Sequence, residues 1–321
     1  MKIKFCFAAC VAALAMIGCN EKIAGLPSAD EEVAPVGKDE VRLTVDVSDP
    51  QTRITGAYTD KKINKVQLFV FDKLGVLETT ATSTTSSVSL TCRNGEKHLV
   101  ALVNAKTLND VKTLDDLSNR KVDLKDMSVA NEVMAGCIFD TLRVDKKVLL
   151  TVDRLAAMVV INKVAVNFVS QQYFQKPVTV KAIYLTNVAG ERTYMTDAPT
   201  TFWYNEGGYD PLTCPDVIYD ELEDEVIISG GQPSYNAHYF YCYPNGQEKP
   251  TRLVVETEID GETFYYPINI GTILPGNKYI CSLNIKHLGS YSPDVLVEEG
   301  TVTATFAVSS WNETRFDETV I

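Results

Sequence analysis

Short runs of alternating apolar and polar residues recur along this chain of 321 residues, and they constrain its fold more than any other feature. The clearest run covers residues 41–47, where Val41, Leu43, Val45 and Val47 alternate with polar side chains. Successive side chains of a strand point to opposite faces, so one face of this segment is wholly aliphatic. The pattern predicts a half-buried β-strand.

A second run near the end of the chain has the same period. Val302, Ala304, Phe306 and Val308 alternate mainly with threonine and serine. The four apolar positions match in number those of residues 41–47. One strand is therefore chemically able to replace the other in a sheet.

Strand-like runs continue between these two segments, and no long amphipathic helix separates them. Residues 97–104 read KHLVALVN, with five apolar residues among eight, which predicts a strand buried on both faces. Asp260 and Gly261 separate two alternating runs, as in a tight hairpin. This succession favours antiparallel sandwiches over βαβ units, and the interruption at residues 170–175 favours a domain boundary there.

The first residues have the features of an export signal. Lys2 and Lys4 precede an apolar run over residues 5–17, which is too short to span a bilayer. The run ends in MIGC, which resembles a bacterial lipobox, so we expect residues 1–18 to be removed and Cys19 to be acylated. The alternative is an ordinary secretory signal with an incidental cysteine. Residues 19–40 lack periodicity and read as a flexible tether.

The charge balance excludes one class of partner. The formal net charge is −12, and no basic cluster with interleaved aromatic residues occurs. A surface of this sign repels nucleic acid, so we expect no nucleic-acid partner.

Catalytic and metal-binding motifs are missing from the sequence. It contains neither G-x-S-x-G nor H-E-x-x-H, and its three histidines are scattered. The acidic run at residues 220–225 lacks the interspersed glycine of a calcium loop and reads as a solvated turn. The spacing of the later cysteines matches no metal or redox motif, so we expect them to be buried as small apolar side chains. They are Cys92, Cys137, Cys214, Cys242 and Cys281. We expect no enzyme activity, no cofactor and no metal site.

Several segments, taken in order, resemble a known family. They are KVQLFVFDKLGVL at 65–77, KHLVALVNA at 97–105, DRLAAMVVI at 153–161, LPGNKYICSLNIKHLGS at 274–290, and a strand ending at Trp311. Together with the lipobox and a loop containing Arg53, they resemble the fimbrillin family, the lipoprotein-derived pilin subunits of Bacteroidales bacteria, also called type V pilins.

The resemblance implies a fold and a mode of assembly. Fimbrillins are all-β proteins with two transthyretin-like β-sandwich domains of antiparallel, Greek-key type, here residues 41–170 and 171–321. They are exported as lipoprotein precursors to the outer membrane. There an arginine-specific protease removes the first strand, and the subunits join head-to-tail by strand exchange into a surface fimbria that supports adhesion.

The implied site residues can be named in this sequence. The bond from Arg53 to Ile54 is the expected cleavage site, residues 41–53 are the removed strand, and residues 301–321 contain the donor strand. Stripping four aliphatic side chains from a groove forfeits roughly 6 to 12 kcal/mol, at about 1.5 to 3 kcal/mol each. An exposed groove and sheet edge of this kind favour a replacement strand.

The sequence leaves two alternatives open. The chain is either a shaft subunit or an accessory subunit of the tip or anchor. A different hypothesis is a monomeric surface lipoprotein that binds glycans through the aromatic loop at residues 203–209, which contains Trp203, Tyr204 and Tyr209.

Overall fold

The computed structural model describes residues 39–48, 63–128, 131–246, 248–310 and 317–320. Strands dominate this part of the chain, which confirms the expected all-β fold. The helical elements described are short: α1 (Leu114–Ser118), η1 (Leu124–Asp126) and η2 (Asp216–Ile218). None of the helices in the described ranges has the length and apolar character needed to cross a membrane.

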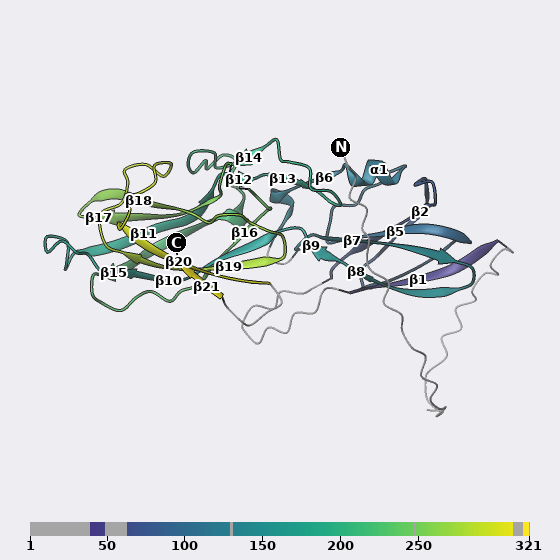
Figure 1. The fold of residues 1–321 in the computed structure, drawn as a ribbon, viewed down its shortest axis with the longest axis horizontal. Coiled ribbons are helices and arrows are strands. Elements are labelled where there is room, and N and C mark those ends of the chain that lie inside the picture. Colours follow the sequence, from purple (N-terminus) through teal and green to yellow (C-terminus); the bar gives the residue numbers. More distant parts are fainter. Residues whose placement is uncertain (1–38, 49–62, 129–130, 247, 311–316, 321) are drawn as a thin grey trace, which may run out of the picture. The chain divides into compact units, whose positions relative to one another are not determined.

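The first part of the chain forms a sandwich of two sheets (Figure 1). Its strands are β1 (Glu40–Ser48), β2 (Val66–Asp72), β3 (Leu77–Ser83), β4 (Ser87–Arg93), β5 (Gly95–Val103), β7 (Met134–Leu142), β8 (Lys146–Thr151) and β9 (Asp153–Arg154). One sheet has the order β4-β1-β8 and the other β3-β2-β5-β7-β9. Inward side chains of both sheets pack into one core cluster.

The five-stranded sheet is buried on both faces around β5. Leu99, Ala101 and Val103 belong to the core between the two sheets, whereas Val100 and Leu102 belong to a second cluster on the opposite face. Leu117 of α1 is buried in that second cluster. The two-sided burial predicted for residues 97–104 is therefore confirmed.

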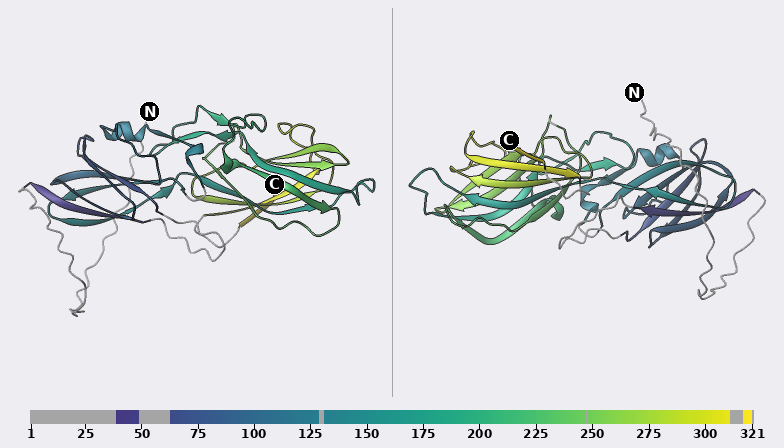
Figure 2. Two further views of the ribbon diagram at one scale, coloured as in Figure 1. Left: turned by 180° about the vertical axis from the view of Figure 1, so that it is seen from behind. Right: turned by 60° about the horizontal axis from the view of Figure 1, so that its bottom comes forward.

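The second sandwich also has two main sheets. One has the order β16-β10-β19-β20-β21 and the other β15-β11-β17-β18. Their strands are β10 (Ala157–Val166), β11 (Pro177–Thr186), β15 (Tyr219–Ile228), β16 (His238–Cys242), β17 (Arg252–Ile259), β18 (Glu262–Asn269), β19 (Asn277–Ile285), β20 (Val302–Ser310) and β21 (Asp317–Val320). Figure 2 shows β20 and β21, in yellow, side by side.

The predicted hairpin between β17 and β18 is present. Asp260 and Gly261 have φ values of 55° and 83°, and Ile259 lies opposite Glu262. Positive φ at both central residues is the conformation that suits the twist of a two-residue hairpin, and it explains why aspartate and glycine occupy these positions.

Two strand pairs depart from the expected antiparallel arrangement. β1 pairs in parallel with β8, and β10 pairs in parallel with β19. Parallel partners need a long crossover between them, and here each crossover contains several other strands. No local sequence pattern reports such a pairing.

The pairing of β10 bears on the division of the chain. The predicted boundary after residue 170 groups β10 with the first sandwich, but β10 pairs with β16 and β19. Divided by its sheets, the chain passes from the first sandwich to the second between β9 and β10. The apolar run at residues 155–166 conceals this passage, because it follows β9 almost without interruption.

A short sheet joins the two parts. β6 (Lys121–Asp123) pairs with β13 (Glu191–Thr193), beside a second small sheet of β12 (Val188–Ala189) and β14 (Trp203–Tyr204). The buried Tyr204 hydroxyl donates to Asp123 Oδ1 at 2.6 Å. Burial raises the pKa of the Asp123 carboxyl, but hydrogen bonds from Tyr204 and Lys125 outweigh it and hold the pKa below its usual range.

Tyr204→Phe is expected to lower the free energy of unfolding by about 1.5 to 3 kcal/mol at neutral pH, because it removes a hydrogen bond to a charged group. Asp123 has a depressed pKa in the folded protein, so this stability is present above the unfolded pKa and is lost as pH falls through the folded pKa. Urea unfolding at pH 7 and pH 3 should show a smaller difference at pH 3. Tyr235→Phe, at an exposed tyrosine, serves as control; an equal difference at both pH values contradicts the assignment.

Four cysteines of the described ranges are free thiols: Cys92, Cys214, Cys242 and Cys281. Cys92, Cys242 and Cys281 are buried as expected, whereas Cys214 is half-buried and Cys137 is exposed. Burial raises the pKa of Cys92 to about 11 and that of Cys242 to about 12, so these thiols stay protonated and unreactive at neutral pH.

Candidate strand-exchange site

β1 holds the three-stranded sheet together. It pairs antiparallel with β4, where Val45 lies opposite Val88, and parallel with β8, where Val45 lies opposite Val148. Among the described strands, β4 and β8 have no other partner in a sheet. Every strand pair of this sheet therefore includes β1.

The inner face of β1 is aliphatic and buried, as its alternation predicted. Val41, Leu43, Val45 and Val47 expose 3, 0, 0 and 4% of their surface. We call the space that β1 fills between β4 and β8 the β1 groove. Aliphatic and thiol side chains of the same core cluster surround it: Val66, Leu68, Val70, Val88, Cys92, Leu99, Ala101, Val148 and Leu150.

The outer face of β1 is polar and makes exposed contacts. Asp46 Oδ1 accepts a hydrogen bond from the Ser87 hydroxyl at 2.8 Å, and Asp46 forms an ion pair with Lys147 at 2.6 Å. The hydrogen bond from Lys147, and then that from Ser87, lowers the pKa of the Asp46 carboxyl. Exposed ion pairs contribute little to stability, so the aliphatic face dominates the attachment of β1.

The pairing sets the direction of any replacement strand. A strand that restores the observed hydrogen bonds must run antiparallel to β4 and parallel to β8, in the direction of β1. It must also present about four apolar side chains, one at every second residue, because strand side chains alternate between faces. Direction and apolar period together specify what the β1 groove accepts.

Several predicted site residues lie outside the described residues. Cys19 falls in residues 1–38, and Arg53 and Ile54 fall in residues 49–62. The described part of the predicted removed strand is β1 itself, which ends at Ser48.

The predicted donor strand occupies a place in its own sheet. β20 pairs with β19 over nine positions and with β21 over four. Ala304 and Phe306 are buried to 5 and 2% exposure, while Val302 and Val308 pack partly buried against the same core. The sequence pattern did not predict β21, a strand too short to show a period.

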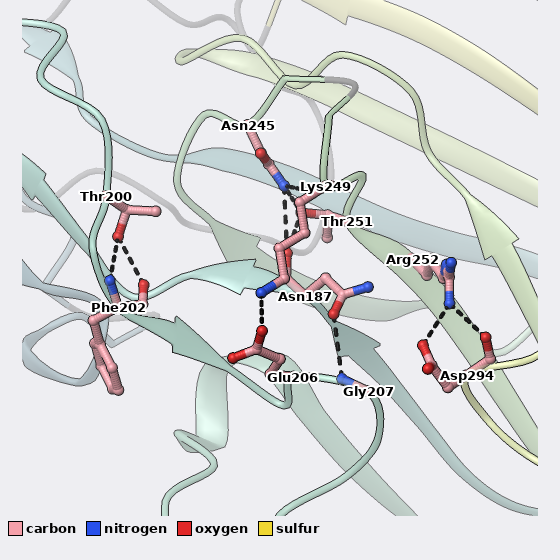
Figure 3. A network of polar contacts seen from close by, with 10 residues as sticks. All are labelled: Asn187, Thr200, Phe202, Glu206, Gly207, Asn245, Lys249, Thr251, Arg252 and Asp294. Carbon is pink, nitrogen blue, oxygen red and sulfur yellow. Dashed lines mark hydrogen bonds and ion pairs between the residues drawn. The ribbon is translucent and has the colours of Figure 1, made fainter.

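The aromatic loop of the alternative hypothesis makes internal contacts. The Lys249 ammonium lies 4.6 Å from the centre of the Trp203 ring and forms an ion pair with Glu206 (Figure 3). The Tyr209 ring stacks on Tyr219, with centroids 4.2 Å apart. These rings pack within the subunit, so their contacts give the glycan hypothesis for this loop no support.

The histidines and the acidic run also have structural partners. The His98 ring packs against Phe139 with centroids 4.9 Å apart, and His238 Nδ1 lies 2.6 Å from Asp220 Oδ2. Residues 220–225 lie in β15 rather than in the expected turn, because they pair with β11 across a bulge. Within the described ranges, no group of three or more His, Cys, Asp or Glu side chains is placed to hold a metal ion.

Solved structures share this fold. A candidate cell adhesion protein from Bacteroides eggerthii superposes with a TM-score of 0.66 and 17% identity, covering 85% of this chain and 96% of the other. A fimbrilin (fimA) from Porphyromonas gingivalis W83 superposes with a TM-score of 0.63 and 17% identity, covering 87% and 99%. None of the curated proteins matches the chain. The fold is thus one found in bacterial fimbrial and candidate adhesion proteins.

A family model matches the first part of the chain. Residues 40–196 match the sequence model of the family described as Major fimbrial subunit protein (FimA). The matched segment begins with β1 and extends just beyond β13. This segment, close to half of the chain, is therefore similar to the fimbrial subunits that the family model describes.

Proposed function

We propose that this fimbrial subunit polymerises head-to-tail by strand exchange after proteolytic removal of β1. The observation that carries the proposal is the position of β1. It supplies four buried aliphatic side chains and every strand pair of its sheet. Its removal leaves an apolar groove between two unpaired strands, and such a groove is completed most simply by another strand.

The proposal includes the export route and the partners. Cys19 carries the lipid that anchors the precursor in the outer membrane, and several acyl chains at one residue hold a protein stably there. An arginine-specific protease at the cell surface cuts between Arg53 and Ile54. The partners after cleavage are further copies of the subunit, and the resulting surface fimbria supports adhesion.

The donor comes from residues 301–321, and we place its first step at β21. Withdrawing all of β20 would break nine pairs with β19 and expose Phe306, which is 2% exposed in the core. Withdrawing β21 breaks four pairs with β20. The C-terminal end is therefore released at lower cost, and its release leads the donation of the strand that carries Val302, Ala304, Phe306 and Val308.

Donor and acceptor surfaces of this kind give an open chain of subunits. The β1 groove lies in the first sandwich, and the donor belongs to the second. Because the two surfaces differ, the contact is heterologous and need not close into a ring, so it extends into a filament.

Truncation after Ser310 is expected to abolish polymerisation and leave a folded subunit. The truncated chain keeps β20 and loses an edge strand that makes four pairs. Electron microscopy and gels of unboiled protease-treated samples measure assembly, and circular dichroism measures folding. The truncated subunit still has a β1 groove, so it should also shorten filaments of the intact chain when mixed with it.

A chain in which the order of residues 311–321 is scrambled is the matched control for length. It should also fail to polymerise if the β1 groove recognises the donor by the order of its side chains. Filaments formed by the truncated subunit alone contradict the assignment of the donor to this end of the chain.

A further inference from the structure

A cavity of about 620 Å³ opens in the second sandwich, between the segment that follows β10 and the connection from β19 to β20. Its lining includes Phe168, Tyr173, Lys286, Leu288, Tyr291 and Glu298. None of its residues belongs to β1 or to the strands beside the β1 groove. The cavity falls in the size range of pockets that bind small molecules or short oligomers.

Main-chain hydrogen bonds fix the walls of this cavity. The Val169 amide donates to the Lys286 carbonyl at 3.0 Å, and Ser290 and Tyr265 exchange two bonds of 2.8 Å. Gly289 has no space for a side chain, since a Cβ there would lie 2.4 Å from the Tyr265 carbonyl oxygen. The connection is therefore held against β18, and the cavity is formed before any ligand arrives.

Two tyrosines give the cavity aromatic walls. Tyr173 is half-buried, and its ring centroid lies 5.9 Å from that of Phe168. Tyr291 is 74% exposed, yet its ring lies 5.1 Å from Phe264 and its hydroxyl lies 3.3 Å from Glu262 Oε2. A ring that is positioned by such contacts and still open to solvent offers a flat apolar face at small entropic cost.

The remaining lining is polar and close to neutral. Ser170, Ser290 and Thr301 offer hydroxyl groups, and Lys286 faces the same cavity as Glu298 and Glu299. One cation and two carboxylates leave a slight negative balance, in a chain with a formal net charge of −12. Anionic ligands are disfavoured by this charge, and a wholly apolar ligand would form no hydrogen bonds with the hydroxyl and charged side chains of the lining.

We propose that this cavity binds a neutral oligosaccharide. A pyranose ring has an apolar C–H face that stacks on a tyrosine and a hydroxyl edge that exchanges hydrogen bonds with serine, threonine and charged side chains. In this proposal the ring stacks on Tyr291. The hydroxyl edge of the sugar faces the part of the lining that contains Ser290 and Glu298. The inference is independent of strand exchange, because the uncleaved subunit already has the complete cavity.

A printed array of neutral and sialylated oligosaccharides, probed with the uncleaved full chain, tests the proposal. We expect binding to neutral sugars and weaker binding to their sialylated forms. For the best neutral sugar, Tyr291→Ala should weaken binding at least tenfold in calorimetric titration. Tyr291→Phe keeps the ring and should change affinity less than threefold.

Tyr235→Ala is the matched control, because Tyr235 is 66% exposed and lies outside the cavity lining. It should bind as the unmodified chain does. Three results overturn the proposal: no neutral sugar bound at millimolar concentration, equal binding by Tyr291→Ala, or binding lost in Trp203→Ala but kept in Tyr291→Ala. The last result would assign the sugar to the 203–209 loop instead.

Discussion

An arginine-specific protease is expected to convert the precursor into filaments by one cut after Arg53, and Arg53→Ala is expected to remain monomeric under the same treatment. The cut separates β1 from the rest of the subunit, and β1 carries four side chains that are at most 4% exposed. At about 1.5 to 3 kcal/mol for each buried aliphatic side chain, a replacement strand that fills the vacated groove contributes roughly 6 to 12 kcal/mol of free energy. That range is comparable with the whole stability of a typical domain.

The measurement combines N-terminal sequencing of the product with electron microscopy. Arg143→Ala is the matched control, because Arg143 is an exposed arginine between β7 and β8 and its loss should leave assembly unchanged. Filaments from the Arg53→Ala protein contradict the proposed trigger. A fragment that begins at Ile54 and stays monomeric indicates an accessory subunit. Absence of cleavage at Arg53 favours the alternative hypothesis of a monomeric glycan-binding lipoprotein.

Arg154→Met is expected to destabilise the subunit by about 3 to 5 kcal/mol, because it breaks a buried ion pair by removing one of its members. Arg154 Nε lies 3.0 Å from Glu132 Oε2, and the two side chains expose only 3 and 8% of their surface. Arg154 belongs to β9, the last strand of the first sandwich, and pairs with Met134 of β7. Urea unfolding of the uncleaved chain gives the free energy directly.

The matched control is an ion pair of similar length on the surface. Lys176 Nζ lies 2.8 Å from Asp260 Oδ1, and the two side chains expose 41 and 48% of their surface. Lys176→Met is expected to cost less than about 1 kcal/mol, because solvent screens the pair. The double variant Glu132→Leu/Arg154→Met should recover most of the free energy of unfolding that Arg154→Met loses. A double variant as unstable as Arg154→Met indicates that packing, not the loss of the ion pair, sets the cost.

Local alternation predicted the parts of the fold that depend on neighbouring residues. The period of residues 41–47 identified all four buried side chains of β1, and Asp260 and Gly261 identified the hairpin. The partners of β1 and β10 could not be predicted in this way. Parallel pairing joins strands that are distant in sequence, and the alternation of a strand is the same whichever way its neighbour runs.

The candidate site shows the same division. The apolar face of β1 is visible in the sequence, but its role as the only described strand that pairs with β4 or β8 depends on the topology. The cavity near Tyr291 lies among connecting segments, which follow no period. Arg53 has no local signal apart from being basic, and only the family resemblance draws attention to it.

The covalent attachment of β1 has a consequence for timing. Leu43 of β1 pairs with Lys146 of β8, so the chain must supply more than a hundred further residues before this sheet can close. Until the cut, β1 competes for the groove as a linked segment, at an effective concentration of about millimolar for a short linker. A donor from another subunit must reach a similar local concentration to displace it. In the proposed mechanism cleavage removes that advantage in one step, so we expect the subunit to stay monomeric until it meets the protease.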